Sequence, residues 1–343
     1  MKLLILGGTR FLGRYLVEAA LEKGHQVTLF NRGKENPNLF PDVDTLIGDR
    51  NGNLEALKGK KWDAVIDTCG FIPRIVRESA ELLSDVTEHY TFISSASVYT
   101  DLTKIGINEN HPVLTISKEK EEEITKGIAG PLYNEYYGPL KYSCEQVIEE
   151  VMPNRALFIR AGLIVGPHDY SDRFTYWVQR VAKGGEVFAP GSPDKQIQLI
   201  DVRDLATGII NMVERRKSGV FNVTGPNDTL TMGDFLQECK SVSKSDAIFT
   251  WIDEEFLDKN QVKYWTEMPL WLPEKLNMPG FLALNIEKAV NEGLTFRSLA
   301  DTIRDTLEWD SSRAVDIERK AGMEYMKEKE LLERWHATIK SNF

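Results

Sequence analysis

The chain has 343 residues, of which 42% are hydrophobic and 27% charged, and its formal net charge is −10. This composition is typical of a globular protein with a sizeable core, in one large or two ordinary domains, and no apolar run approaches the roughly 20 residues of a membrane helix. The negative charge disfavours non-specific binding to nucleic acid or to anionic membranes.

The number and spacing of the cysteines indicate a reducing compartment. Cys69, Cys144 and Cys239 are far apart and in no metal-binding spacing, which argues against a disulfide or zinc framework. The first apolar run is followed by Gly and Arg rather than by a small-residue cleavage site, so we expect no signal peptide. We therefore expect a cytoplasmic protein.

The chain opens with an apolar run over residues 2–6, a glycine-rich turn over residues 7–13, and a helical pattern that includes Tyr15, Leu16 and Ala19. A strand, a tight glycine turn and a helix form a phosphate cradle, because backbone N–H groups and the positive end of the helix dipole face one point. The sequence therefore predicts dinucleotide binding here, with an ordinary glycine turn as the alternative.

Strands and helices alternate through the rest of the first half. The expected strands are residues 26–30, 43–47, 63–67, 90–94 and 155–160, and the expected helices are residues 53–57, 75–83 and 139–152. This alternation predicts a parallel sheet covered on both faces, which is the doubly wound Rossmann form of the α/β class. Ligand should lie beyond the carboxyl ends of the strands.

Residues 101–136 interrupt the alternation. The segment holds the charged run 118–123, flanked by Gly and Pro, and it has no apolar periodicity. We expect a solvated surface excursion; the alternative is a mobile flap over the site.

The regular alternation of strands and helices ends after Gly166, where the connections become longer and mixed. This change predicts a second, smaller domain of mixed α/β structure. Strands at 196–200 and 219–223, with a helix at 204–213 between them, are expected to re-enter the first domain. The expected domains are residues 1–165 and 196–224 for dinucleotide binding, and residues 166–195 and 225–310 for substrate, followed by a tail of residues 311–343.

Two stretches of the second half carry aromatic residues. Trp251, Trp265 and Trp271 lie among prolines within residues 225–300, which favours packed irregular structure over a ligand lid. Residues 317–339 have apolar side chains at helical spacing, which predicts an amphipathic tail helix docked on its own domain.

Tyr137 and Lys141 are four residues apart, a spacing that places a phenol and an ammonium on one helix face. A nearby cation lowers the pKa of tyrosine toward the range where proton transfer is effective. Ser94, Ser95 and Ser97 follow the fifth expected strand, where a hydroxyl can bind a substrate oxygen. The alternatives are a surface helix pair and serines that bond their own backbone.

These stretches together resemble the extended short-chain dehydrogenases/reductases, the superfamily of NAD(P)-dependent sugar epimerases and dehydratases. The resemblance rests on residues 7–13, 94–99, 137–141, 160–167, 201–204, 221–225 and 293–309. More narrowly, the chain is similar to a bacterial subgroup labelled isoflavone-reductase-like or epimerase-like. That subgroup also resembles chloroplast stem-loop-binding proteins, which keep the fold while acting on RNA.

The resemblance implies an NAD(P)-dependent oxidoreductase or epimerase that interconverts a hydroxyl and a carbonyl on a small polar, sugar-nucleotide-like substrate. Tyr137 would exchange the proton, Lys141 would hold the nicotinamide ribose and lower the pKa of Tyr137, and Ser95 would position the substrate oxygen. The implied cofactor contacts are Gly7, Gly8, Thr9, Arg10, Phe11, Leu12, Gly13, Asn31, Arg32, Asp49, Cys69, Gly70, Ile164 and Val165.

The sequence departs from the family pattern at three places. Arg10 replaces a glycine of the phosphate turn. Asn31 and Arg32 stand where an acid would bind the ribose of NAD, which favours NADP over NAD because arginine suits a 2′-phosphate; the alternative for Arg32 is a solvated turn residue. Ala96 and Ser97 replace the acidic pair of the sugar dehydratases, which argues against dehydration.

Other partners receive weaker support. The alternative function is an RNA-binding or nucleotide-sensing protein that retains the fold, and the net charge does not favour it. His168 and Asp169 have no matching ligand nearby in the sequence, so we expect no metal site. By analogy with the family, a homodimer would form through the helices at 75–83 and after Tyr137.

Overall fold

A computed structural model describes residues 1–314 and 317–341. Seven parallel strands form the central sheet, in the order β11-β6-β5-β4-β1-β2-β3. These strands are β1 (Lys2–Leu6), β2 (Gln26–Asn31), β3 (Asp44–Ile47), β4 (Trp62–Asp67), β5 (Thr87–Ser95), β6 (Ala156–Ala161) and β11 (Gly219–Val223). The Rossmann prediction is confirmed, including the strand at 219–223.

Helices cover both faces of this sheet, because successive strand side chains point to opposite sides. Leu3 and Ile5 pack toward α1 (Phe11–Glu22) and α6 (Val202–Glu214). Leu4 and Leu6 pack with residues of the other pair of helices. That pair is α2 (Pro73–Ser84) and α4 (Tyr137–Val151). Each predicted helix is present, although residues 53–57 form only a 3₁₀ turn, η1 (Glu55–Leu57).

The insertion at 101–136 is largely exposed, as expected, but it contains an unexpected helix, α3 (Lys118–Thr125). The Ser117 side chain caps this helix by accepting from the Lys120 N–H at 3.2 Å. Only Thr125 is buried within it, so the apolar period that reveals most helices is missing. The insertion also pairs with the second half of the chain, through a bridge between Ile107 and Leu284.

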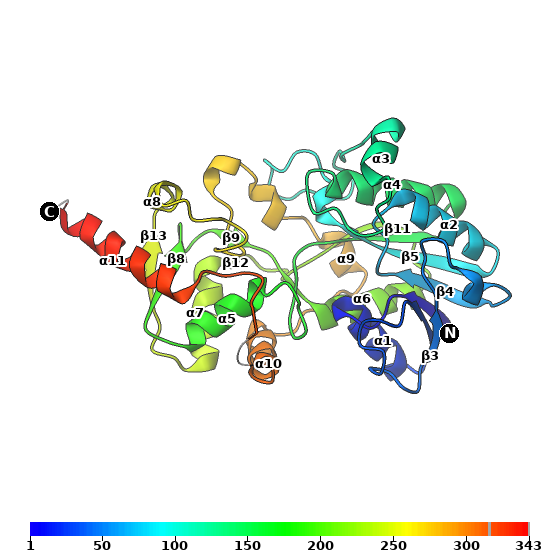
Figure 1. The fold of residues 1–343 in the computed structure, drawn as a ribbon, viewed down its shortest axis with the longest axis horizontal. Helices are drawn as coiled ribbons and strands as arrows, with labels where there is room; N and C mark the ends of the chain where they lie inside the picture. The colour runs from blue at the N-terminus through cyan, green and yellow to red at the C-terminus, as the bar shows by residue number, and fades with distance from the viewer. Residues whose placement is uncertain (315–316, 342–343) are drawn as a thin grey trace.

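Most of the second half builds a separate cluster of short sheets and helices at the other end of the molecule (Figure 1), whereas residues 164–165, 200–201 and 287–291 pack beside α6 and β11. Its strands are β7 (Ile164–Val165), β8 (Glu186–Pro190), β9 (Gln196–Ile197), β10 (Ile200–Asp201), β12 (Leu230–Thr231) and β13 (Ile248–Ile252). Its helices are α5 (Arg173–Ala182), α7 (Met232–Ser243), α8 (Glu254–Lys259), α9 (Glu287–Asn291), α10 (Leu299–Ser311) and α11 (Tyr325–Ser341), with the 3₁₀ turns η3 (Glu274–Leu276) and η4 (Pro279–Leu282).

Residues 196–200, which were expected to re-enter the first domain, do not join its central sheet, although Ile200 is buried in the core that this sheet shares with α1 and α6. β9 pairs with β12 and β10 pairs with β7, so neither strand joins the seven-stranded sheet. The backbone changes partner between the two strands, since the Leu199 N–H donates to Gly225 O at 2.7 Å and the Ile200 N–H to Leu163 O at 2.9 Å. The Gln198 side chain between them bonds the backbone of Leu284, at 3.0 and 2.9 Å. Ile197 and Leu199 are buried in the core of the second half instead.

The aromatic stretch is packed but more regular than expected. Trp271 is buried and Trp251 and Trp265 pack against the same core, in a stretch that includes α7, β13 and α8. The tail helix starts at Tyr325 rather than at residue 317, and its Leu331 and Leu332 enter that core, as predicted for a docked helix. Residues 315–316 and 342–343 of the predicted tail lie outside the described part. Among the described helices, none is both long enough and apolar enough to cross a membrane.

Candidate functional site

The turn between β1 and α1 is a tight cradle that only glycine can form. Gly7 and Gly8 have φ of +106° and +94°, and the Gly7 N–H donates to Phe30 O at 2.9 Å. A Cβ added to Gly13 would lie 2.8 Å from the backbone nitrogen of Gly8, so α1 approaches the turn closely. No side chain caps the first turn of α1, so its N–H groups are available to an anion except that of Gly13, which donates to Arg10 O at 2.9 Å. These residues fit a dinucleotide pyrophosphate.

The end of β2 holds the turn in place. The Asn31 side chain donates to Gly7 O at 3.1 Å and accepts from the Gly33 N–H at 2.8 Å. Arg32, by contrast, is exposed. A small pocket opens beside these residues, lined by Thr9, Leu29, Asn31, Gly33, Pro37, Phe40, Thr45 and Ile47. Asn31 therefore connects the glycine turn after β1 to the turn after β2. Arg32 presents an exposed guanidinium at the end of β2.

A buried ion pair that sequence reasoning missed lies after β3 and β4. The Arg50 guanidinium donates to both carboxylate oxygens of Asp67, at 2.7 and 2.8 Å, and to Ser79 at 2.6 Å. Burial alone would raise the pKa of Asp67, but Arg50 outweighs it and holds that pKa below its usual value. Burial raises the pKa of the neighbouring Cys69 thiol, which donates to Leu6 O at 3.5 Å.

The predicted Asp49 lies beside this pair, where its carboxylate accepts from the Asn51 N–H at 3.0 Å and its backbone bridges to Asn53. Gly70 follows Cys69, and its buried position leaves no room for a side chain, since a Cβ would lie 2.5 Å from Phe92. The sequence carried no signal for Arg50, because nothing in its spacing relates it to Asp67.

Tyr137 is the first residue of α4 and lies at the carboxyl end of β5. Its ring is 5.3 Å from that of Tyr133 in the insertion. Burial is the main cause that raises the pKa of Tyr137 well above its usual value, with Tyr133 and Tyr170 adding to it; Ser95 and Arg173 act in the opposite direction. Ser95 and Tyr137 are therefore neighbours, as predicted.

Lys141 lies one turn further along α4 and is 3% exposed. Its ammonium donates to the backbone carbonyls of Gly70 at 2.7 Å and Ile93 at 2.6 Å, so two of its three N–H groups are used. Burial lowers the pKa of Lys141 to about 8. The expectation that Lys141 lowers the pKa of Tyr137 finds no support here, because Lys141 is not among the main groups that shift it.

A second buried network joins α4 to strands β5 and β6. Glu145 accepts from Ser94 at 2.5 Å and from two nitrogens of Arg160, which lies on β6. The Arg160 guanidinium lies 5.0 Å from the Tyr99 ring centre, and the Tyr99 hydroxyl donates to Asn222 at 2.6 Å. The network fixes the helix that carries Tyr137 and Lys141 against β5 and β6.

The predicted residues Ile164 and Val165 form β7, which lies in a separate two-stranded sheet after β6. Val165 is buried, Ile164 packs with the core below α1, and both pair with β10. The chain then passes over α1, so that Tyr170 covers Arg10 with 4.1 Å between the guanidinium carbon and the ring centre. The structure thus brings Ser95, Tyr137 and Lys141 to the strand ends that also bear the glycine turn, and leaves Arg32 at the rim. Sequence reasoning missed Tyr170.

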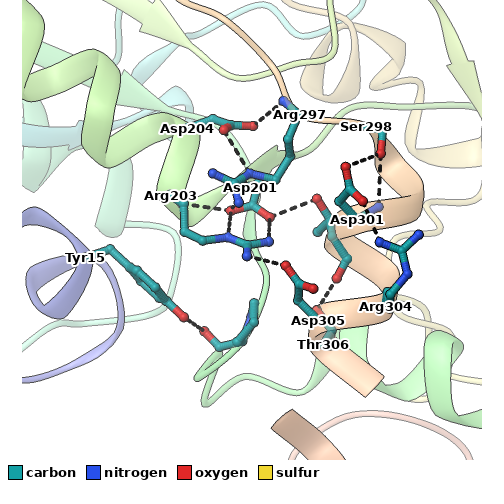
Figure 2. A network of polar contacts seen from close by, with 12 residues as sticks. Tyr15, Asp201, Arg203, Asp204, Arg297, Ser298, Asp301, Arg304, Asp305 and Thr306 are labelled. Carbon is teal, nitrogen blue, oxygen red and sulfur yellow. Dashed lines mark hydrogen bonds and ion pairs between the residues drawn. The ribbon is translucent and has the colours of Figure 1, made fainter. Parts of the chain in front are cut away.

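The start of α6 is joined to α10 by a polar network (Figure 2). Arg203 forms ion pairs with Asp201 and Asp305, and Asp201 also accepts from Thr302 at 2.8 Å. Arg297 pairs with Asp204 at 2.9 Å. These contacts anchor α10 and the segment before it to α6, the helix that covers the central sheet.

Comparison with known proteins gives a consistent assignment. A family model described as "NAD dependent epimerase/dehydratase family" matches residues 3–224. The chain is 29% identical over 242 residues to the chloroplast stem-loop binding protein of 41 kDa b of Arabidopsis thaliana, a match of 65% of this chain but only 58% of that relative. It is 25% identical over 241 residues to dTDP-6-deoxy-L-talose 4-dehydrogenase (NAD(+)) of Aggregatibacter actinomycetemcomitans, covering 65% of this chain and 83% of the relative.

Solved structures show the same fold. The UDP-Glc/GlcNAc 4-epimerase of Campylobacter jejuni superposes with a TM-score of 0.67 at 16% identity, over 91% of this chain and 99% of that one. The UDP-glucuronic acid 4-epimerase of Bacillus cereus in complex with NAD gives 0.65 at 16% identity, over 91% and 99%.

Proposed function

Because the chain belongs to the NAD dependent epimerase/dehydratase family, we propose that it is an NAD(P)-dependent oxidoreductase or epimerase. It interconverts a hydroxyl and a carbonyl group on a small, sugar-nucleotide-like substrate. The observation that carries this proposal is the meeting of Ser95, Tyr137 and Lys141 with a dinucleotide cradle at the same ends of the strands. Similar proteins whose names record dehydrogenase and 4-epimerase activities on nucleotide sugars support it.

Each residue of the proposed site has a role in the reaction that follows from its position. A bound nicotinamide supplies or accepts a hydride at the substrate carbon. Tyr137 moves the proton of the substrate oxygen through its hydroxyl, and Ser95 holds that oxygen with a hydrogen bond. Lys141 binds the nicotinamide ribose with the N–H that Gly70 and Ile93 leave free. Because Lys141 is anchored on two carbonyls, its place is fixed before any ligand binds.

Gly7, Gly8 and the first turn of α1 would hold the pyrophosphate, because their backbone leaves room for it and no side chain caps that turn. Asp49 would lie on the adenine side, Cys69 and Gly70 would line the cofactor beside Lys141, and Ile164 and Val165 would approach the nicotinamide. Residues 166–195 and 225–310 form the substrate domain, because most of their buried apolar side chains make a core of their own.

NADP is the cofactor that the local chemistry favours. Arg32 is an exposed cation at the end of β2, and no acid is present there to bind a ribose 2′-hydroxyl. Against this, a similar dehydrogenase carries NAD(+) in its name and a similar epimerase structure contains NAD. Mass spectrometry of nucleotide released from the purified protein distinguishes the two cofactors.

A second candidate function is RNA binding, favoured by the name of the similar chloroplast stem-loop binding protein. The net charge of −10 opposes this function, because RNA binding draws much of its affinity from phosphate contacts. Retention of a stem-loop RNA on a filter at physiological salt, and its loss at higher salt, would support it.

The main proposal is tested with a panel of nucleotide sugars incubated with the protein and either cofactor. Absorbance at 340 nm follows net oxidation or reduction, and NMR detects an epimer that forms without net change in cofactor. Turnover of a nucleotide sugar by either route supports the proposal, and turnover of none of them contradicts the substrate class.

A further inference from the structure

A short loop, residues 167–170, lies along the first turns of α1. At its start, the Tyr15 hydroxyl donates to Pro167 O at 3.3 Å, and the Arg14 guanidinium lies 3.4 Å from His168 Nδ1. At its end, the Tyr170 ring covers Arg10. The loop therefore runs from the second turn of α1 back to the glycine turn.

The Tyr170 end of the loop also touches Phe11, whose ring stands edge-on to that of Tyr170 with 6.2 Å between the ring centres. Phe11 and Arg10 open α1, so Tyr170 sits over the residues that would face a bound pyrophosphate. Arg10 is the residue that replaces a glycine of the turn. Its side chain is thus held by an aromatic ring at the mouth of the cradle.

The two ends of the loop are held with different strength. Pro167 and Tyr15 are buried, whereas Arg10 is exposed and Tyr170 is 43% exposed. An exposed cation–π contact changes an equilibrium by only about two- to fivefold. A guanidinium forms stronger, charge-assisted hydrogen bonds to phosphate oxygens. Tyr170 is therefore the end that a phosphate can release.

Tyr170 is connected to the proposed catalytic residue through the insertion. Tyr133 packs against Tyr137, with 5.3 Å between the ring centres. Burial is the main cause that raises the pKa of Tyr133 to about 12, and the neighbouring Tyr170 adds to it through its charge and a side-chain hydrogen bond. Arg10 acts on Tyr133 in the opposite direction. A row of side chains, Arg10, Tyr170, Tyr133 and Tyr137, thus extends from the glycine turn to the proton-transfer site.

We propose that Arg10 and Tyr170 form a latch that the dinucleotide opens. The Arg10 guanidinium leaves the Tyr170 ring for the pyrophosphate, and Tyr170 and Tyr133 then move away from Tyr137, so that substrate enters after cofactor. The inference rests on the proposed function, since it needs a pyrophosphate at the glycine turn. It assigns Arg10 two alternative partners and gives Tyr170 a role in the order of binding.

A double-mutant cycle tests the competition for Arg10. The dissociation constants of NADPH and NADH are measured by calorimetry for the wild type, Tyr170→Leu, Arg10→Leu and the double variant. We expect Tyr170→Leu to bind the preferred cofactor about two- to fivefold more tightly, because Arg10 is freed. Arg10→Leu should bind more weakly, and Tyr170→Leu should have no effect in that background. Tyr325→Leu, which removes an exposed tyrosine at the start of α11, is the control; α11 lies away from the central sheet (Figure 1).

A second readout follows the two tyrosines directly. ADP carries the pyrophosphate without the nicotinamide, so it should increase nitration of Tyr170 and Tyr133 by tetranitromethane in the wild type, but not in Arg10→Leu. An unchanged or weaker cofactor affinity in Tyr170→Leu, an effect that persists without Arg10, or nitration that ADP does not increase would overturn the latch. If neither the wild type nor Tyr170→Leu binds either cofactor, the proposed function fails as well.

Discussion

Glu145 and Arg160 meet in a buried fork, in which two guanidinium nitrogens lie 3.1 and 2.7 Å from the two carboxylate oxygens. Glu145 comes from the helix that carries Tyr137 and Lys141, and Arg160 from the strand next to β5. The pair therefore sets the position of the proposed catalytic helix relative to the strand ends. Its carboxylate is also the acceptor for Ser94, one residue before Ser95.

Glu145→Gln should destabilise the protein by about 3 kcal/mol, because Arg160 would keep a buried charge without its partner. Urea denaturation measures this change in the free energy of unfolding. Glu150→Gln is the matched control on the same helix, since Glu150 pairs with Arg77 at the surface and should contribute less than about 1 kcal/mol. Equal losses in the two variants would contradict the structural role of the fork.

Gly13→Ala should lower dinucleotide affinity about tenfold or more while the protein remains folded. The added methyl would lie 2.8 Å from the Gly8 nitrogen, so the turn must open and its N–H groups lose their alignment on the phosphate. Calorimetry with NADPH and NADH measures the effect, and circular dichroism checks the fold. Gly130→Ala, where the methyl meets open space, should bind as the wild type does. Undiminished binding by Gly13→Ala would place the cofactor elsewhere.

Arg32→Gln tests the choice between the two cofactors. Loss of a charged hydrogen bond to the 2′-phosphate should weaken NADPH binding about tenfold and leave NADH binding unchanged. Lys34→Gln removes a neighbouring exposed charge and controls for general electrostatic attraction. Tighter binding of NADH than of NADPH by the wild type would show that Arg32 is only a solvated turn residue.

The pH dependence of stability should reveal His168. Burial, with the nearby Arg14 charge, lowers the pKa of His168 to about 4. The unfolded chain has a histidine pKa near 6.5 and so binds more protons between these values, which means that stability falls as the pH falls through this window. From pH 7 to pH 5, the wild type should lose roughly 1 kcal/mol more than His168→Asn, a value discounted for partial exposure.

Asparagine is the chosen replacement because His168 has a φ of +67°, which asparagine tolerates. Urea denaturation at both pH values gives the comparison, and His336→Asn at the exposed end of the chain is the control. The same acid-induced loss in His168→Asn as in the wild type would contradict the role of this histidine.

Much of the fold follows from local sequence patterns. The side chains of residues 2–6 alternate between the two helical layers that cover the sheet. A glycine-rich turn between a strand and a helix is typical of a dinucleotide-binding fold. α3 could not be predicted in the same way, because an exposed helix that buries only Thr125 needs no apolar period. Residues 196–200 resemble one strand in the sequence, but the backbone bonds of Leu199 to Gly225 and of Ile200 to Leu163 divide them into two, and the sequence does not reveal these partners.

The candidate site also contains residues that the sequence predicts and residues that it does not. Ser95, Tyr137 and Lys141 could be predicted because each lies at a motif of fixed spacing. Arg50 and Glu145 could not, since their partners Asp67 and Arg160 are set by the three-dimensional fold rather than by spacing. Tyr170 was missed for the same reason: it reaches Arg10 across 160 residues of sequence.

The central claim is that Tyr137 transfers the proton in an NAD(P)-dependent reaction. The most direct measurement compares turnover of an accepted nucleotide sugar, and cofactor affinity, in the wild type and Tyr137→Phe. We expect turnover to fall about 100-fold or more while the dissociation constant of the cofactor stays the same, because phenylalanine lacks only the hydroxyl. Full turnover by Tyr137→Phe with cofactor bound would contradict the mechanism.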